Sequence, residues 1–192
     1  MKNKKNFYTI KKNINDSINN LKILNDQKYF DQILKISNEI IRTIKNKKKI
    51  IFCGNGGSAA DSQHLCAELV SKFLKNRKPF SSISLTTNTS TITSISNDFS
   101  FDKIFSKQIE AVGVKGDFLF AISTSGKSKN VKEAIKVAKK KGIKTFLLTG
   151  LKNKSRNLSD IVLEVPASRV DRIQEMHILV GHIICEIVEN TC

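Results

Sequence analysis

The sequence predicts a doubly wound α/β fold, in which a five-stranded parallel sheet is covered by helices on both faces. From residue 49 onward, short apolar runs of strand type alternate with longer segments of helical periodicity. Two of the strand-type runs end directly in loops rich in glycine and serine. Strands that alternate with helices form parallel sheets, because each crossover helix carries the chain back to the end of the sheet at which the previous strand began.

Two amphipathic helices are expected before the sheet, at 7–26 and 29–46. In the second, isoleucines recur every three or four residues and define one apolar face. A chain of 192 residues is long enough for one domain with its own core. We therefore expect a single domain over 1–192, made of a helical extension (1–46) and an α/β core (47–192).

The core elements are predicted from apolar runs and from the residues that end them. A proline at 166 stops the last strand-type run, and a long apolar-periodic helix follows it. The Ser/Thr-rich stretch after the second strand carries no predicted element. Strands are expected at 49–53, 82–86, 117–122, 143–148 and 161–165, and helices at 59–74, 101–112, 131–141 and 170–189.

The formal net charge of +16 suggests nucleic-acid binding at first, but the composition argues against it. The excess is mostly lysine spread along the chain, whereas nucleic-acid readers use arginine and aromatic residues. No apolar stretch approaches the length of a membrane helix, and the N-terminus does not resemble a secretory signal. The four cysteines show no paired spacing, so we expect a cytoplasmic protein with free thiols.

Two loops are candidates for binding a phosphate group. Asn55-Gly56-Gly57-Ser58 follows the first predicted strand, and a loop from Ser123 to Ser128 follows the third. Small residues let backbone N–H groups approach an anion, and hydroxyls at a helix N-terminus add donors. The same serines could simply cap helices. Because both loops follow strands, the phosphate interpretation is favoured over capping, and neither loop matches a nucleotide-binding motif.

Polar side chains on two predicted helices form a second candidate site. His64 and Glu68 are four residues apart, so they share one helix face and could bind a divalent metal or simply each other. On the last helix, Asp171, Gln174, His177 and His182 interrupt an apolar pattern of isoleucine, methionine and valine. Gln174 and His182 are about 12 Å and about 80° apart on a regular helix. One metal could bind both only with extended side chains, a helix break or a contribution from a neighbouring subunit.

Together these motifs resemble the sugar isomerase (SIS) domain family and, within it, the phosphoheptose isomerases. The resemblance covers nearly the whole chain. It rests on the strand–GNGGS–helix unit, the strand–STSGKS–helix unit and the DRIQEMH segment. The specific part is the combination of His64 and Glu68, Asn97-Asp98, and Asp171 and Gln174 with His182.

The resemblance implies a homotetramer of flavodoxin-like subunits with active sites between subunits and one Zn²⁺ per subunit. The implied reaction converts sedoheptulose 7-phosphate to D-glycero-D-manno-heptose 7-phosphate through an enediol, the first step toward the ADP-heptose of lipopolysaccharide. Glu68 and His182 match the acid/base pair. The matched metal ligands are His64, Glu68, Gln174 and His182. The matched substrate-binding residues are Asn55, Gly56, Gly57, Ser58, Glu68, Asn97, Asp98, Ser123, Thr124, Ser125, Ser128, Asp171 and Gln174.

Two alternatives share the SIS loops. One is a non-catalytic SIS regulator that binds the replication initiator protein, which should not need Glu68, Gln174 and His182 together. The other is an isomerase of arabinose 5-phosphate, which usually carries an added regulatory module that this chain has no room for. The sequence therefore favours the phosphoheptose isomerase.

Overall fold

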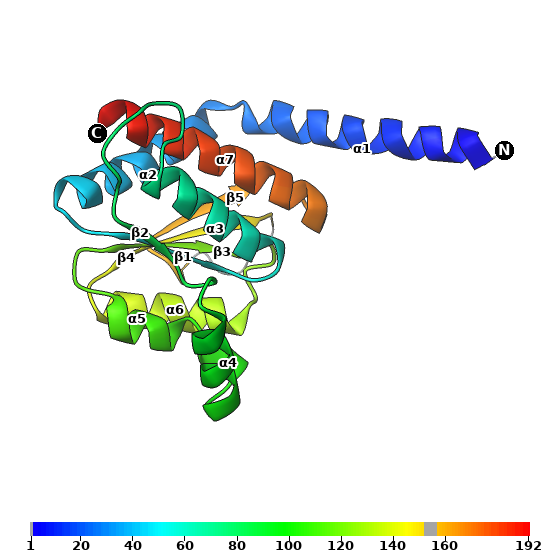
Figure 1. The fold of residues 1–192 in the computed structure, drawn as a ribbon. Helices are drawn as coiled ribbons and strands as arrows, with labels where there is room; N and C mark the ends of the chain where they lie inside the picture. The colour runs from blue at the N-terminus through cyan, green and yellow to red at the C-terminus, as the bar shows by residue number, and fades with distance from the viewer. Residues whose placement is uncertain (1, 152–156) are drawn as a thin grey trace.

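The computed structural model describes residues 2–151 and 157–192, and it confirms the predicted α/β fold (Figure 1). The strands are β1 (Ile50–Gly54), β2 (Ser82–Ser84), β3 (Phe118–Ile122), β4 (Lys144–Gly150) and β5 (Ile161–Val165). Their order is β2-β1-β3-β4-β5, and every neighbouring pair is parallel. This order is the flavodoxin-like one, in which the chain reverses direction across the sheet between β1 and β3.

The helices form a layer on each face of the sheet. Figure 1 shows α2, α3 and α7 on one face and α5 and α6 on the other. Alternate side chains of the strands supply two separate cores, so that Phe52 and Phe120 face the first layer while Ile51 and Leu119 face the second. The helices are α1 (Lys2–Leu24), α2 (Gln27–Lys45), α3 (Gly57–Val70), α4 (Thr89–Asp98), α5 (Ser106–Val112), α6 (Lys129–Lys140) and α7 (Val170–Thr191).

Helix α4 was not predicted, and its composition explains why. Threonine, serine and isoleucine make up most of it, and β-branched residues have low helix propensity. The helix begins at a good cap, since the Asn88 side chain accepts a hydrogen bond from the backbone N–H of Thr91 at 2.9 Å. Inside it, the Thr93 hydroxyl donates to the carbonyl of Thr89. Local capping and side-chain bonds therefore stabilise a helix that periodicity alone does not indicate.

The first helix begins at Lys2 instead of residue 7, and two helices of the α/β core also depart from their predicted boundaries. The one expected over 101–112 is a 3-10 turn at Phe101–Lys103 followed by α5. The one expected over 59–74 ends at Val70, because the next backbone N–H groups find another partner. That of Leu74 donates to the carboxylate of Glu189 at 2.7 Å. A carboxylate from a distant helix therefore ends α3 four residues early.

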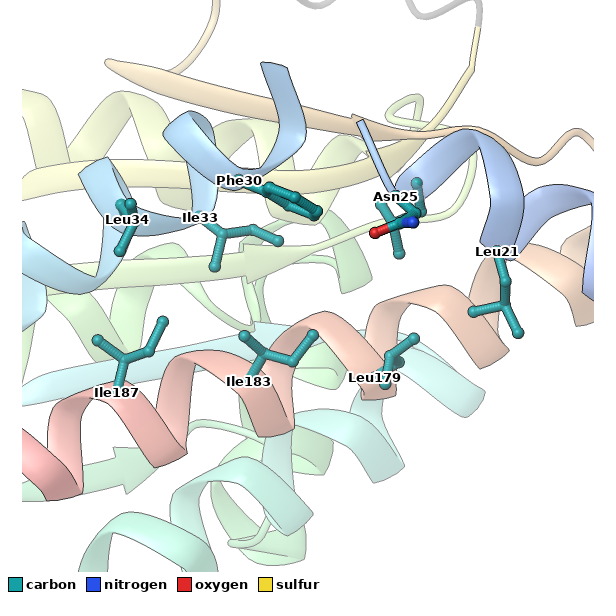
Figure 2. Close-up of a pocket in the computed structure, with 9 residues that line it drawn as sticks. Leu21, Asn25, Phe30, Ile33, Leu34, Leu179, Ile183 and Ile187 are labelled. Carbon is teal, nitrogen blue, oxygen red and sulfur yellow. The ribbon is translucent and has the colours of Figure 1, made fainter. Parts of the chain in front are cut away.

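Helix α1 extends away from the sheet and its covering helices as a single helix (Figure 1). Its exposed surface includes Phe7, Ile10, Ile14 and Ile18, which recur at helical spacing. A cavity of about 420 Å³ follows where α1 ends, between α2 and α7 (Figure 2). It is lined by Leu21, Leu24, Asn25, Phe30, Ile33, Leu34, Leu179, Ile183 and Ile187. Within residues 2–151 and 157–192, no helix has both the length and the hydropathy that crossing a membrane requires.

Candidate active site

The two predicted phosphate loops lie side by side, at the carboxyl ends of β1 and β3. These strands are neighbours in the sheet and mark the point where its winding reverses, which is where doubly wound folds bind ligands. The Asn55 and Asn130 side chains join the loops by two reciprocal amide hydrogen bonds of 2.8 and 2.9 Å. Asn130 is 2% exposed and was not among the predicted site residues. Its only sequence signal is its position beside the serine loop.

The glycine turn opens directly into α3. Gly56 adopts a φ of +56°, a left-handed conformation that favours glycine, and serves as the helix N-cap. Ser58 is buried in the first turn of the helix, and its N–H donates to the carbonyl of Asn55. A side chain on Gly57 would collide with the Gln174 amide, so α7 packs closely on this turn. The turn thus presents backbone N–H groups at a helix N-terminus.

The serine loop after β3 also ends at a helix N-terminus. The Ser123 and Ser128 hydroxyls are 3.2 Å apart, and Ser128 occupies the N-cap position of α6 without a side-chain capping bond. The Ser125 hydroxyl accepts the backbone N–H of Lys127. Thr124 accepts the backbone N–H of Gly150 through its carbonyl. Converging hydroxyls at the positive end of a helix dipole are suited to a phosphate group.

His64, Glu68 and His182 converge where α3 meets α7. Nε2 of His64 lies 2.9 Å from Nε2 of His182 and 3.1 Å from a carboxylate oxygen of Glu68. One potential ligand atom from each residue falls within 4.8 Å of the others. Two imidazole nitrogens and a carboxylate oxygen are a donor set that Zn²⁺ uses in proteins. The cluster therefore fits a divalent metal, and it brings together three of the four predicted ligands.

An open cleft of about 370 Å³ lies beside this cluster, between α3 and the first half of α7. Helix α7 is continuous, so Gln174 and His182 do not share a helix break that would bring them together. Gln174 instead places its amide against Gly57 and shares the cleft with His64. The lining residues are Ala60, Asp61, His64, Asp171, Gln174, Glu175 and Ile178.

Asp171 lines the cleft, and its carboxylate is hydrogen-bonded to Arg169. Arg169 donates to both of its carboxylate oxygens, at 3.1 and 2.5 Å. These hydrogen bonds hold the pKa of the Asp171 carboxyl below its usual range. Arg169 also contacts Asp16 and Asn13 of α1. Asp171 is therefore an ionised, oriented acceptor at the rim of the cleft, and α1 helps to hold it there.

Asp61 is a cleft residue that the sequence reasoning missed. It lies three residues before His64 on the same face of α3, and burial raises its pKa to about 6 while the charge of His64 opposes the shift. Its Oδ2 atom is buried and forms no hydrogen bond with the described residues. The available signal was the i, i+3 spacing to His64.

The structure does not bring Asn97 and Asp98 to this cleft. They lie at the exposed end of α4, and the Asn97 amide donates to Asp98 at 2.9 Å. In Figure 1, α4 projects away from the sheet on the side of α5 and α6. This pair of predicted substrate-binding residues therefore lies apart from the cleft between α3 and α7.

The fold and the two adjoining loops define a sugar isomerase domain, and comparison with known families agrees. The SIS domain family matches residues 14–150. A phosphoheptose isomerase of Clostridium acetobutylicum is 50% identical over 170 residues, which cover 88% of this chain and 87% of the relative. One from Aliarcobacter butzleri is 50% identical over 157 residues, covering 81% of this chain and 83% of that relative.

Solved structures give the same result. A phosphoheptose isomerase from Francisella tularensis superposes with a TM-score of 0.88 at 31% identity over all of both chains. One from Neisseria gonorrhoeae gives a TM-score of 0.84 at 35% identity, again over both whole chains. The chain therefore belongs to the phosphoheptose isomerase family of SIS-domain proteins.

Proposed function

We propose that this protein is an aldose–ketose isomerase that converts sedoheptulose 7-phosphate to D-glycero-D-manno-heptose 7-phosphate, the first step toward ADP-heptose and lipopolysaccharide heptose. The observation that carries the proposal is the His64–Glu68–His182 cluster beside two phosphate-type loops, in a chain about 50% identical to proteins named phosphoheptose isomerase. A non-catalytic SIS regulator would not need this cluster. The four free cysteines are consistent with the cytoplasmic location that we infer.

The proposed chemistry divides between Glu68 and His182. Isomerisation moves one proton between C1 and C2 and another between O1 and O2, through an enediol. The Glu68 carboxylate takes the carbon-bound proton, and the His182 imidazole transfers the proton between the oxygens. Hydroxyls of Ser123 and Ser128 bind the distant phosphate, and that binding holds the reacting carbons in place.

The same cluster would hold a metal ion, which we propose to be zinc. His64, Glu68 and His182 supply the ligand atoms, and Gln174 lies in the adjoining cleft as a further candidate. A bound ion supplies polarisation of the substrate carbonyl and stabilisation of negative charge on oxygen. A ligand atom that binds the ion cannot also take a proton, so the second carboxylate oxygen of Glu68 and the other ring nitrogen of His182 would carry the proton transfers.

We also propose that the protein is a homotetramer with active sites between subunits. The apolar stripe of α1, with Phe7, Ile10 and Ile14, is exposed in one subunit, and the cavity between α2 and α7 is lined mostly by aliphatic side chains (Figure 2). A neighbouring subunit would bury both. It would also allow Asn97 and Asp98 to line a cleft formed by two subunits.

The direct test is to incubate the purified protein with zinc and sedoheptulose 7-phosphate and to follow aldoheptose phosphate by NMR. We expect formation of the aldose in the wild type and its loss in Glu68→Gln. Glu110→Gln is the matched control, because Glu110 is an exposed carboxylate on α5, on the opposite face of the sheet. A folded, zinc-supplied wild type that forms no aldose would refute the function, and an active Glu68→Gln would remove the assignment of the base.

A further inference from the structure

A buried ion pair outside the cleft binds the loop that follows α3. Glu189, on α7, has a side chain that is 1% exposed. Its carboxylate accepts the backbone N–H groups of Phe73, Leu74 and Lys75 at 3.0, 2.7 and 2.9 Å. It also accepts the Nε–H of Arg77 at 3.0 Å. Residues 71–81 form neither helix nor strand, so this carboxylate replaces the hydrogen bonds of regular structure there.

The arginine of this pair holds the end of α3 in turn. Its guanidinium donates to the carbonyl of Glu68 at 2.7 Å and to that of Leu69 at 2.9 Å. Further bonds reach the carbonyls of Ser71 and Lys78. The last carbonyls of a helix have no partner within it, and Arg77 supplies donors to two of them; the carbonyl of Leu69 also accepts the backbone N–H of Phe80 at 3.0 Å. One of these belongs to the residue that we propose as the catalytic base.

The loop places an aromatic ring against the other proposed catalytic residue. The Phe73 ring stacks on the His182 ring, with centroids 5.4 Å apart and an angle of 23° between the planes. His182 and Glu189 are seven residues apart on α7, which puts them within about 20° of each other around the helix. Both therefore face the loop after α3, one through an aromatic contact and the other through its carboxylate.

We propose that the Arg77–Glu189 pair is a positioning device that holds Phe73 against His182 and fixes the end of α3 that carries Glu68, thereby setting the geometry of the acid/base pair. Phe73, Arg77 and Glu189 touch no reacting atom in this scheme and act through His182 and Glu68. The proposal rests on the isomerase function proposed above. It extends that function to residues outside the cleft and outside the phosphate loops.

The first test observes the His182 ring directly, without substrate or metal. The chain has only three histidines, so ¹³C labelling at their Cε1 atoms gives three resonances that single substitutions can assign. We expect Phe73→Leu to shift the His182 resonance downfield, because the shielding of the stacked ring is lost. Glu189→Gln should shift it too, because the loop is released, while His177 should keep its position in both variants. Phe73→Tyr keeps the ring and should keep the wild-type position.

The second test measures kcat and KM separately for the same variants. We expect kcat to fall about 10- to 100-fold in Glu189→Gln and Phe73→Leu, since a misplacement on the order of 1 Å can cost about 100-fold. KM should change little, because the phosphate loops at Ser123 and Ser58 are anchored by other contacts. Phe73→Tyr keeps the aromatic ring and should retain most of the wild-type kcat.

Asp117→Asn is a matched control for loss of stability. Asp117 is a buried carboxylate that accepts the backbone N–H groups of Lys49 and Val114 and pairs with the Lys49 ammonium at 2.7 Å. It directly precedes β3, so it lies at the amino ends of the strands, whereas the site lies at their carboxyl ends. We expect a comparable drop in the midpoint of denaturant unfolding, with kcat and the His182 resonance unchanged.

Two results would overturn the positioning role. One is folded Glu189→Gln and Phe73→Leu proteins with wild-type kcat and an unmoved His182 resonance. The other is an Asp117→Asn protein that loses as much kcat as they do. A wild type without isomerase activity would instead reject the proposed function, and the His182 resonances would still report whether the loop holds that ring.

Discussion

His177 gives a prediction about how stability depends on pH. The side chain lies on α7, is 0% exposed, and faces the core instead of the cleft. Burial lowers the pKa of its imidazole from 6.5 to about 4, and the nearby Thr149 backbone opposes the shift. The folded protein therefore keeps His177 neutral at pH values where an unfolded chain is already protonated.

The magnitude follows from the difference between the two pKa values. An unfolded histidine titrates near 6.5, so between that pH and about 4 the unfolded state binds a proton at this residue that the folded state does not bind. The free energy of unfolding must therefore decrease as pH falls from about 6.5 to about 4. Each pKa unit corresponds to about 1.4 kcal/mol, so the full effect is about 3 kcal/mol. Above pH 7 both states are neutral and the contribution disappears.

The assay is urea unfolding between pH 4 and 7.5 for the wild type, His177→Leu and His177→Phe. Protein concentration is kept constant, because association of subunits would add to apparent stability. The two variants differ in packing, so they should differ in stability at pH 7.5. The free energy of unfolding of each variant, relative to that of the wild type, should nevertheless increase by about 3 kcal/mol as pH falls to 4. Differences that stay constant with pH would show that His177 titrates normally in the folded protein.

Three further predictions follow from close contacts and exposure. Gly57→Ala should leave the fold intact but displace the Gln174 amide, so that kcat/KM falls about 10-fold or more while the thermal midpoint changes by a few degrees. Ser128→Ala should raise KM for the sugar phosphate about 10-fold with little change in kcat, since a hydrogen bond to a charged group contributes about 1.5–3 kcal/mol. A thiol reagent should modify the exposed Cys192 in the native protein and leave Cys185 unmodified until unfolding, because burial raises the pKa of Cys185 to about 12; mass spectrometry of labelled peptides distinguishes the two.

The sequence was sufficient for the sheet and for the loops that follow its strands. Strand-type runs and helical periodicity depend on local patterns. The carboxyl ends of parallel strands all lie at one end of the sheet. Locating the loops after β1 and β3 therefore also placed their polar residues at that end of the sheet: Asn55, Ser58, Ser123 and Ser128. The pairing of His64 with Glu68 was equally local, since four residues along a helix fix a shared face.

What the sequence could not show depends on contacts between distant elements. The early end of α3 is set by Glu189, more than a hundred residues later in the chain. The α4 helix is stabilised by a cap and hydroxyl bonds that do not appear in a hydrophobic pattern. Gln174 was expected among the ligands of one metal, and its contact with Gly57 depends on how α7 crosses the glycine turn. Each of these is a property of packing and not of spacing.

The meeting of His64 with His182 shows how one small residue makes such packing possible. Gly181 precedes His182 on α7, and a Cβ there would lie 2.6 Å from both methyl groups of Leu65. Leu65 in turn follows His64 on α3. The absence of a side chain at 181 lets the two helices approach closely at this point, and the adjacent residues His64 and His182 bring their Nε2 atoms to 2.9 Å. A glycine inside a helix costs about 1 kcal/mol relative to alanine. Its presence one residue before a histidine is therefore the sequence signal for where the two halves of the site join, and the close approach of α3 and α7 is its physical reason.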